Sequence, residues 1–186
     1  MPNYRRAHIP GATYFFTAKT ENNATIFNSE NSIIQLKQVI QETRKRWPFE
    51  IPAIVVLPDH IHTIWELPRD DSNFSIRWSW LKKELTKRYL KEGGIEQPIS
   101  LSRERNRRRG VWQRRYWEHV IKDEDDYEAH FDYIHWNPVK HGYVQCPSEW
   151  KYSLIHRWIE RGIYDARWGC GQTTPYVLKQ TKEMGE

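Results

Sequence analysis

The spacing of hydrophobic and polar positions predicts a chain that alternates strands and helices. Three segments rich in aliphatic, aromatic and β-branched side chains are predicted strands: residues 12–19, 50–57 and 60–67. Between the first two, residues 31–46 carry apolar side chains at helical spacing, and Trp47-Pro48 closes that predicted helix. The pair Pro58-Asp59 favours a turn, so we expect it to join the second strand to the third.

The second half of the chain adds a predicted helix and a short strand, at residues 74–91 and 116–121. Asp123 is expected to cap a further helix that continues to about Trp136. Asn137-Pro138 should end this helix, because a residue that precedes proline is pushed out of the α region. The order of these elements is that of a split βαβ unit with one helix appended. We therefore expect an α+β protein with a ferredoxin-like antiparallel sheet, helices on one face and an appended helix.

The composition agrees with a folded domain and excludes a membrane protein. The chain has 186 residues and a mean hydropathy of −0.87, and no apolar run approaches the roughly 20 residues that a membrane span needs. Its 10 tryptophans argue against disorder, because aromatic rings bury large areas. The length suits one domain, which we place at residues 1–170, followed by a tail at 171–186.

The two cysteines, Cys146 and Cys170, are too few for a disulfide framework or a four-thiolate zinc site. The N-terminal residues lack the apolar stretch of a signal peptide, so we expect a cytosolic protein. The aromatic residues beyond position 143 are numerous enough that we expect this segment to pack against the domain.

The positive charge is concentrated in one segment. The chain carries a net charge of +5, whereas residues 103–115 alone carry +6. Arginine favours bidentate contacts with phosphate or guanine, and the rings of Trp112, Tyr116 and Trp117 offer stacking surfaces for bases. This pattern indicates a nucleic-acid contact, with a solvated loop as the alternative. The candidate DNA contacts are Tyr4, Arg5, Arg6, Arg103, Arg105, Arg107, Arg108, Arg109, Arg114 and Arg115.

Two histidines, His60 and His62, form the sharpest local motif. Side chains alternate along a strand, so both imidazoles lie on one face of the sheet and Ile61 lies on the other. Two imidazoles in this arrangement can bind one divalent ion and leave positions for other ligands. The alternative is a pair of strand histidines with hydrogen-bonding partners. Asp59 either shapes the preceding turn or orients an imidazole by accepting its hydrogen bond.

Tyr133 and Asn137 form a second candidate pair, because residues four apart share one face of a helix. A phenol is a poor nucleophile at neutral pH since its pKa is about 10, but a divalent ion that polarises a phosphoryl oxygen makes its attack feasible. Mg²⁺ or Mn²⁺ fits this role better than Zn²⁺. Lys140 is a candidate phosphate contact, or a cation suited to a helix C-terminus. His119 is expected either to hold a metal-binding residue in position or to contact DNA.

Seven segments together form a recognisable pattern: YRR at 4–6, GATYFFT at 11–17, RWPF at 46–49, VLPDHIHTIW at 56–65, WQRRYWEH at 112–119, DYIHWNPVKHG at 132–142 and WKYS at 150–153. This pattern resembles the REP-associated tyrosine transposases, a branch of the single-tyrosine HUH transposases. In that family the metal-binding histidine pair falls on His60 and His62, the nucleophile on Tyr133 and the third metal ligand on Asn137.

The resemblance implies a ferredoxin-like fold whose appended helix carries the nucleophile. Family members bind imperfect palindromic hairpins of single-stranded DNA beside a short recognition sequence. They cut through a 5′-phosphotyrosine link and release a free 3′-OH, with a divalent metal, Mg²⁺ or Mn²⁺, as the expected cofactor. The resemblance thus implies a transposase-like enzyme that nicks and rejoins DNA.

Two other functions fit the same residues. One is a protein that binds its hairpin but no longer cuts it, and the other is an unrelated metal-dependent hydrolase that uses the histidines without Tyr133. We expect no membrane partner. We expect a monomer, because one tyrosine suffices if its helix folds back onto its own sheet. A dimer that exchanges this helix is the alternative. The implied substrate also suggests a bacterial protein that acts at the nucleoid.

Overall fold

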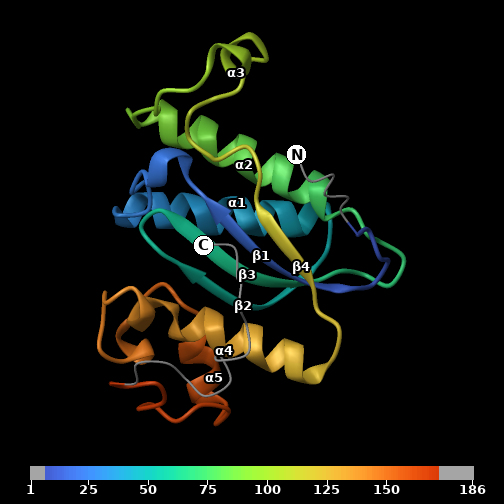
Figure 1. Ribbon diagram of the computed structural model, residues 1–186, viewed down its shortest axis with the longest axis vertical. Coiled ribbons are helices and arrows are strands. Elements are labelled where there is room, and N and C mark those ends of the chain that lie inside the picture. The colour runs from blue at the N-terminus through green and yellow to red at the C-terminus, as the bar shows by residue number, and fades with distance from the viewer. Residues whose placement is uncertain (1–6, 172–186) are drawn as a thin grey trace.

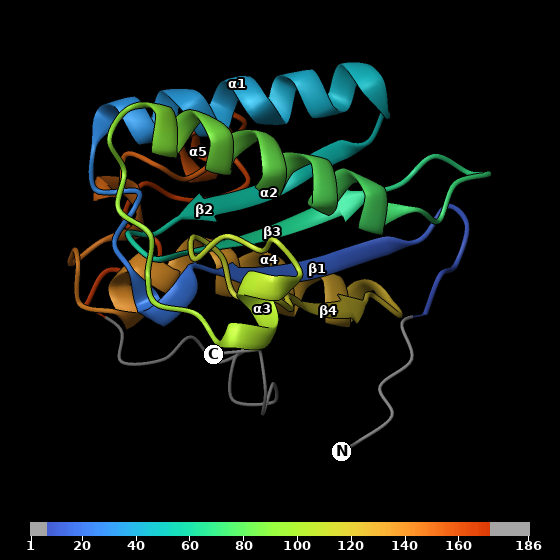
Figure 2. The same ribbon diagram turned by 90° about the horizontal axis from the view of Figure 1, so that it is seen from above.

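The computed structural model describes residues 7–171, and it contains a four-stranded antiparallel sheet between two layers of helices (Figures 1 and 2). The strands are β1 (Thr13–Lys19), β2 (Glu50–Val56), β3 (His60–Glu66) and β4 (Trp117–Val120). Their order across the sheet is β2-β3-β1-β4. This order, with helices between the strands, confirms the predicted ferredoxin-like α+β fold.

Two long helices cover one face of the sheet, as Figure 2 shows. α1 (Glu30–Arg46) begins where the Ser29 side chain accepts a hydrogen bond from a backbone N–H, and α2 (Phe74–Lys91) begins in the same way at Asn73. The core beneath them buries the alternate side chains of β1 and β3 that face these helices. Its sheet residues include Tyr14, Phe16, Ala18, Ile61 and Trp65, and its helix residues include Leu36, Val39, Trp78 and Leu81.

The opposite face of the sheet is covered by α4 (Glu124–Lys140). Phe15 and Ile64 pack on this side with Ile134 and Trp136 of α4, and all of them are at most 5% exposed. Both faces of β1 and β3 are therefore buried. Strands that are buried on both faces carry polar side chains only where these have partners. The buried histidines of β3 are therefore candidates for a specific role.

The aromatic C-terminal segment packs against the core between the sheet and α4, as predicted. Its short helix α5 (Ile155–Glu160) lies beside β2, where the indole N–H of Trp158 donates to the carbonyl oxygen of Pro52 at 2.9 Å. The indole N–H of Trp150 donates to the carbonyl oxygen of Val56 at 3.0 Å. These bonds hold the segment on the edge strand of the sheet.

The prediction that Asn137-Pro138 ends the last long helix was wrong, because α4 continues to Lys140. Pro138 removes one N–H from the final turn, but both Asn137 and Pro138 are buried, and the packing of this turn outweighs the lost bond. The helix ends instead at Gly142, whose φ of 71° lies in the left-handed region that glycine adopts easily. The N–H groups of Gly142 and the following residue bond two carbonyls of the last turn.

The remaining elements are short. They are the helix α3 (Leu101–Arg105) and the 3-10 turns η1 (Glu21–Asn23) and η2 (Pro147–Glu149). Cys146 and Cys170 form a disulfide bond that closes the C-terminal segment. Within residues 7–171, no helix is long and apolar enough to cross a membrane. The predicted tail lies outside the described residues apart from its first residue, Gly171.

Candidate active site

His60 and His62 lie at the beginning of β3, on the face of the sheet that α4 covers. They are 3% and 0% exposed, and their ring centroids are 4.8 Å apart. In the sheet they pair with Lys19 and Thr17 of β1. The structure therefore confirms that the two imidazoles share one face of a strand.

Each imidazole is held through its Nδ1 atom. Nδ1 of His60 lies 2.7 Å from an Asp59 carboxylate oxygen, and Nδ1 of His62 lies 2.8 Å from the hydroxyl oxygen of Thr17. Burial opposes ionisation of the Asp59 carboxyl, but the hydrogen bond and charge of His60 outweigh burial and hold the pKa of Asp59 below its usual value. These contacts at Nδ1 fix the orientation of both rings.

Tyr133 packs directly against this pair. Its ring centroid is 5.2 Å from that of His62, and the residue is 4% exposed. The Lys140 ammonium donates a hydrogen bond of 3.1 Å to the Tyr133 hydroxyl and lies 4.9 Å from the centroid of its ring. Tyr133 is buried, whereas Lys140 is exposed. α4 therefore brings the phenol, a cation and the two imidazoles into one place.

Asn137 follows Tyr133 by one helical turn and is fully buried. His60, His62 and Asn137 offer two imidazole nitrogens and one amide oxygen, a set of neutral donors that Mg²⁺, Mn²⁺ or Zn²⁺ accepts. The hydrogen bonds at both Nδ1 atoms are the arrangement that metal-ligating histidines usually have. The residues present thus fit a divalent cation.

The sequence did not assign His141 to the site, yet its ring centroid is 5.1 Å from that of His60. Residue 141 caps the C-terminus of α4, which was expected to end earlier. The continuation of the helix past Pro138 carries His141 back to β3. His141 is exposed, so it lies at the entrance of the site.

One predicted contributor, His119, lies away from the histidine pair. His119 pairs with Phe15 of β1, whereas His62 pairs with Thr17, and His119 is bonded to Asp126 at 2.8 Å. The structure therefore does not bring His119 to the histidine pair. The candidate DNA contacts Tyr4, Arg5 and Arg6 lie outside the described residues.

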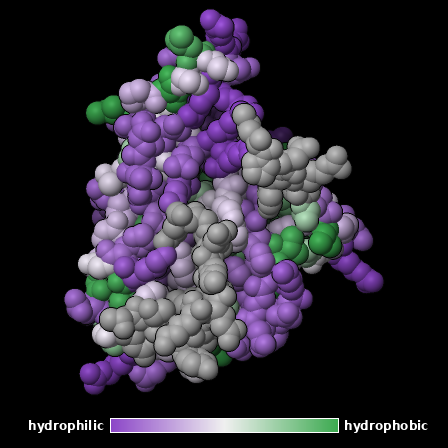
Figure 3. All heavy atoms as spheres, viewed as in Figure 1, coloured by the Kyte–Doolittle hydropathy of each residue, from purple (hydrophilic) through white to green (hydrophobic). Residues whose placement is uncertain are grey.

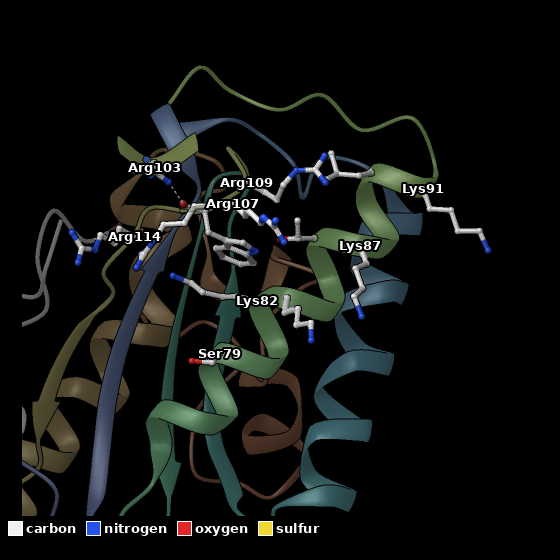
Figure 4. Close-up of a pocket in the computed structure, with 13 residues that line it drawn as sticks. Ser79, Lys82, Lys87, Lys91, Arg103, Arg107, Arg109 and Arg114 are labelled. Carbon is white, nitrogen blue, oxygen red and sulfur yellow. Dashed lines mark hydrogen bonds between the residues drawn. The ribbon is translucent and has the colours of Figure 1, made fainter. Parts of the chain in front are cut away.

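The arginine-rich segment forms one wall of a basic groove with a volume of about 790 Å³, and α2 forms the other wall (Figure 4). Figure 3 shows predominantly hydrophilic side chains over this upper part of the molecule. The basic residues that line the groove are Lys82, Lys83, Lys87 and Lys91 of α2, together with Arg103, Arg107, Arg108, Arg109 and Arg114. The sequence singled out the arginines and missed the lysines, because the lysines are spread over an ordinary amphipathic helix.

Some of these arginines are already neutralised. Arg103 pairs with Glu21 at 2.6 Å, and Arg109 pairs with Glu96 at 2.6 Å. In the part of the chain that the structure describes, Arg107 and Arg108 form no ion pair, and Arg107 has a left-handed φ of 52°. A left-handed residue other than glycine is costly, and such strain occurs preferentially at functional sites.

The rings of Trp112, Tyr116 and Trp117 were expected to stack on bases. This expectation was wrong for Trp112, which is 5% exposed. Its ring packs 5.8 Å from Phe27, and the Lys82 ammonium lies 5.3 Å from its centroid. The ring of Tyr116 stacks 5.4 Å from that of Trp78, against the core between the sheet and the helices α1 and α2. The groove thus offers cationic groups rather than exposed rings.

Comparisons with known proteins agree with this architecture. Residues 9–137 match the family model described as transposase IS200 like. The chain is 39% identical over 176 residues to the REP-associated tyrosine transposase of Escherichia coli K12, covering 95% of both sequences. It is 40% identical over 169 residues to a Haemophilus influenzae protein provisionally given the same name, covering 91% of this chain and 94% of that protein.

A solved structure of a REP-associated tyrosine transposase bound to a REP hairpin matches with a TM-score of 0.75 and 37% identity, over 95% of both chains. The ferredoxin-like sheet and the tyrosine-bearing helix packed on it are thus those of a transposase. The chain belongs to the IS200-like transposase family, in its branch of REP-associated tyrosine transposases.

Proposed function

We propose that this protein is a metal-dependent endonuclease and strand transferase that binds REP-type hairpins in single-stranded DNA and cuts beside them with Tyr133. The observation that carries the proposal is the position of Tyr133, with its ring 5.2 Å from that of His62 and its hydroxyl bonded to Lys140. The relative whose structure contains a REP hairpin supports the class of substrate.

The proposed reaction is a transesterification. The Tyr133 oxygen attacks the phosphorus of a phosphodiester, and the bond between that phosphorus and the 3′ oxygen breaks. The phenol loses its proton and the leaving 3′ oxygen gains one, so the products are a 5′-phosphotyrosine and a free 3′-OH. The tyrosyl ester keeps the energy of the broken bond, so the 3′-OH of another strand can displace Tyr133 without ATP.

His60, His62 and Asn137 are the residues that would hold the cation. A bound Mg²⁺ or Mn²⁺ supplies Lewis-acid polarisation of a phosphate oxygen. Asp59 and Thr17 fix the two imidazoles, and Lys140 stabilises negative charge on the phenol oxygen.

The basic groove is proposed to hold the phosphates of the hairpin. Its cationic groups contact a sugar–phosphate backbone, and its single ring, Trp112, is too buried to stack on bases. Thr20 joins the groove to the candidate active site, since its backbone pairs with Trp112 and its N–H and hydroxyl both bond the Asp59 carbonyl oxygen at 2.9 Å. A hairpin held in the groove would therefore lie at the end of the sheet that carries His60.

The working unit is proposed to be a monomer, because α4 packs on the sheet of its own chain and places Tyr133 beside its own histidines. Light scattering of the hairpin complex tests this directly. A mass of one chain per hairpin is expected, and a complex of two chains that shares α4 would contradict it.

The proposed function is tested by incubating the protein with a labelled REP hairpin that keeps its single-stranded flank, in the presence of Mg²⁺ or Mn²⁺. Denaturing electrophoresis should show a cut strand and a covalent protein–DNA adduct. Tyr133→Phe should abolish both products and leave hairpin affinity within about twofold, because the phenyl ring still fills the same space. Cleavage by Tyr133→Phe would reject Tyr133 as the nucleophile.

Tyr143→Phe is the matched control, since Tyr143 is 44% exposed and stacks on Trp150 at 5.3 Å near the same helix end. This variant should cut normally. Hairpin binding with no cleavage by the unmodified protein under any of these metals would instead favour a protein that has lost its nuclease activity.

A further inference from the structure

A second cluster of metal-binding side chains lies where β4 meets the first turns of α4. His119, Asp126 and His130 each bring one ligand atom within 4.8 Å of the others. Oxygen atoms of the Asp126 carboxylate lie 2.8 Å from Nε2 of His119 and 3.0 Å from Nδ1 of His130. The cluster thus joins a strand to a helix through three convergent side chains.

Each imidazole has a nitrogen about as far from an Asp126 carboxylate oxygen as two neighbouring ligand atoms lie on one ion, and the three ligand atoms lie within 4.8 Å of one another. Bonds from Zn²⁺ to imidazole nitrogen or carboxylate oxygen are about 2.0–2.2 Å long, so neighbouring ligand atoms on one ion lie roughly 3 Å apart. The rings of His119 and His130 stack with centroids 4.6 Å apart, and both turn a nitrogen toward the Asp126 carboxylate. Nδ1 of His130 also lies 2.8 Å from the backbone carbonyl oxygen of Asp126. The Lys122 N–H donates to the same carboxylate at 2.9 Å and holds it in place.

An ion can reach this cluster from solvent. The side chain of His130 is 5% exposed, but those of His119 and Asp126 are 24% and 18% exposed. The buried histidine therefore forms the floor, and the other two residues form a partly open rim. A site of this kind leaves a coordination position for water.

The ring of Phe15 separates the cluster from the candidate active site. Its centroid is 4.7 Å from that of His130, 5.7 Å from that of His62 and 6.0 Å from that of Tyr133. A buried phenyl ring offers no ligand, so one ion cannot be shared by the two sets of histidines. The two clusters are two separate places along the same helix–sheet interface.

We propose that His119, Asp126 and His130 form a second cation site, which takes a transition ion such as Zn²⁺ or Co²⁺. Two imidazoles with one carboxylate are a donor set that these ions accept in proteins. The bound ion fixes the first two turns of α4 on β4, and His130 precedes Tyr133 by three residues on that helix. This inference does not depend on the role of Tyr133.

The test is a titration of the chelator-treated, full-length protein with Co²⁺, followed by its visible absorption and by equilibrium dialysis. The unmodified protein should bind two equivalents, one at each histidine cluster. His119→Phe should bind one, because phenylalanine keeps the ring stacking on His130 but removes a ligand. Asp126→Asn, which keeps an acceptor for the Lys122 N–H, should lose the same equivalent.

The double variant with His60→Ala and His62→Ala isolates the proposed site and should retain one equivalent of Co²⁺. Added Co²⁺ should raise its unfolding temperature, and adding His119→Phe to it should remove that rise. His8→Phe is the control histidine substitution, since His8 is exposed and stacks 4.7 Å from Phe74 outside both clusters. Two equivalents bound by His119→Phe, or none bound by the double variant, would overturn the proposal.

Discussion

The Lys140 ammonium lies 3.1 Å from the hydroxyl oxygen of Tyr133, seven residues earlier on the same helix. This contact exists because α4 continues for two residues past Pro138 before Gly142 ends it. A cation at this position stabilises negative charge on the phenol oxygen, which an attack on phosphorus requires. The last turn of the helix therefore contributes directly to the candidate nucleophile.

Lys140→Met should lower the rate of adduct formation about tenfold to a hundredfold at pH 7, because it removes a charged donor from the reacting oxygen. Single-turnover rates measure this loss. Lys37→Met, a change to an exposed lysine of α1, should leave the rate unchanged, and an unchanged rate in Lys140→Met would contradict a role for Lys140 at the phenol oxygen.

Asp59→Asn should weaken activation by Mn²⁺ about tenfold to a hundredfold, because the carboxylate orients His60 through a 2.7 Å bond. The concentration of Mn²⁺ that gives half-maximal cleavage is the quantity to measure. The rate at saturating Mn²⁺ should fall less. Asp70→Asn, at an exposed position of the loop after β3, is the matched control. An unchanged Mn²⁺ requirement in Asp59→Asn would leave Asp59 with a role in the turn alone.

The double variant Arg107→Gln and Arg108→Gln should weaken hairpin binding and make its salt dependence shallower. The slope of log affinity against log salt should fall by about 0.9 for each duplex phosphate that the protein no longer neutralises. Filter binding across a series of salt concentrations measures this slope. Arg109→Gln removes the same kind of charge but should keep the slope, since two of its guanidinium nitrogens already bind Glu96 at 2.6 Å. Identical slopes for all three proteins would place the DNA outside the groove.

His135 should make the protein less stable in acid. Burial lowers the pKa of its imidazole from 6.5 to about 3, because the fully buried ring lies between Phe131 and Tyr164. Its folded-state pKa is lower than its unfolded one, so the unfolded chain binds the extra proton between these values. The stability that neutral His135 contributes is complete above about pH 6.5 and declines as pH falls toward 3, by a few kcal/mol in total.

Denaturant midpoints of His135→Phe should therefore decline less between pH 6.5 and pH 4 than those of the unmodified protein. Other groups titrate in this range, so the prediction concerns the difference between the two proteins. His8→Phe, at an exposed histidine, should follow the unmodified protein. Parallel curves for His135→Phe and the unmodified protein would contradict the assignment.

Much of the fold was predictable because its signals are local. Side chains alternate along strands and repeat every 3.6 residues along helices, so the four strands and the three long helices were predicted within a few residues of their ends. The same rules placed His60 beside His62, and Tyr133 one turn before Asn137. The end of α4 was mistaken because the proline rule is local, whereas the burial of Asn137 and Pro138 depends on the rest of the molecule.

The sequence by itself determined the elements, the two pairs of candidate residues and the concentration of arginine between positions 103 and 115. Only the tertiary structure decided which groups meet across long separations. Packing on both faces of the sheet places α4 against β3, and it brings Tyr133 to His62, His130 to His119 and Lys82 to Trp112. Such contacts depend on how whole surfaces bury each other, which no short window of residues encodes.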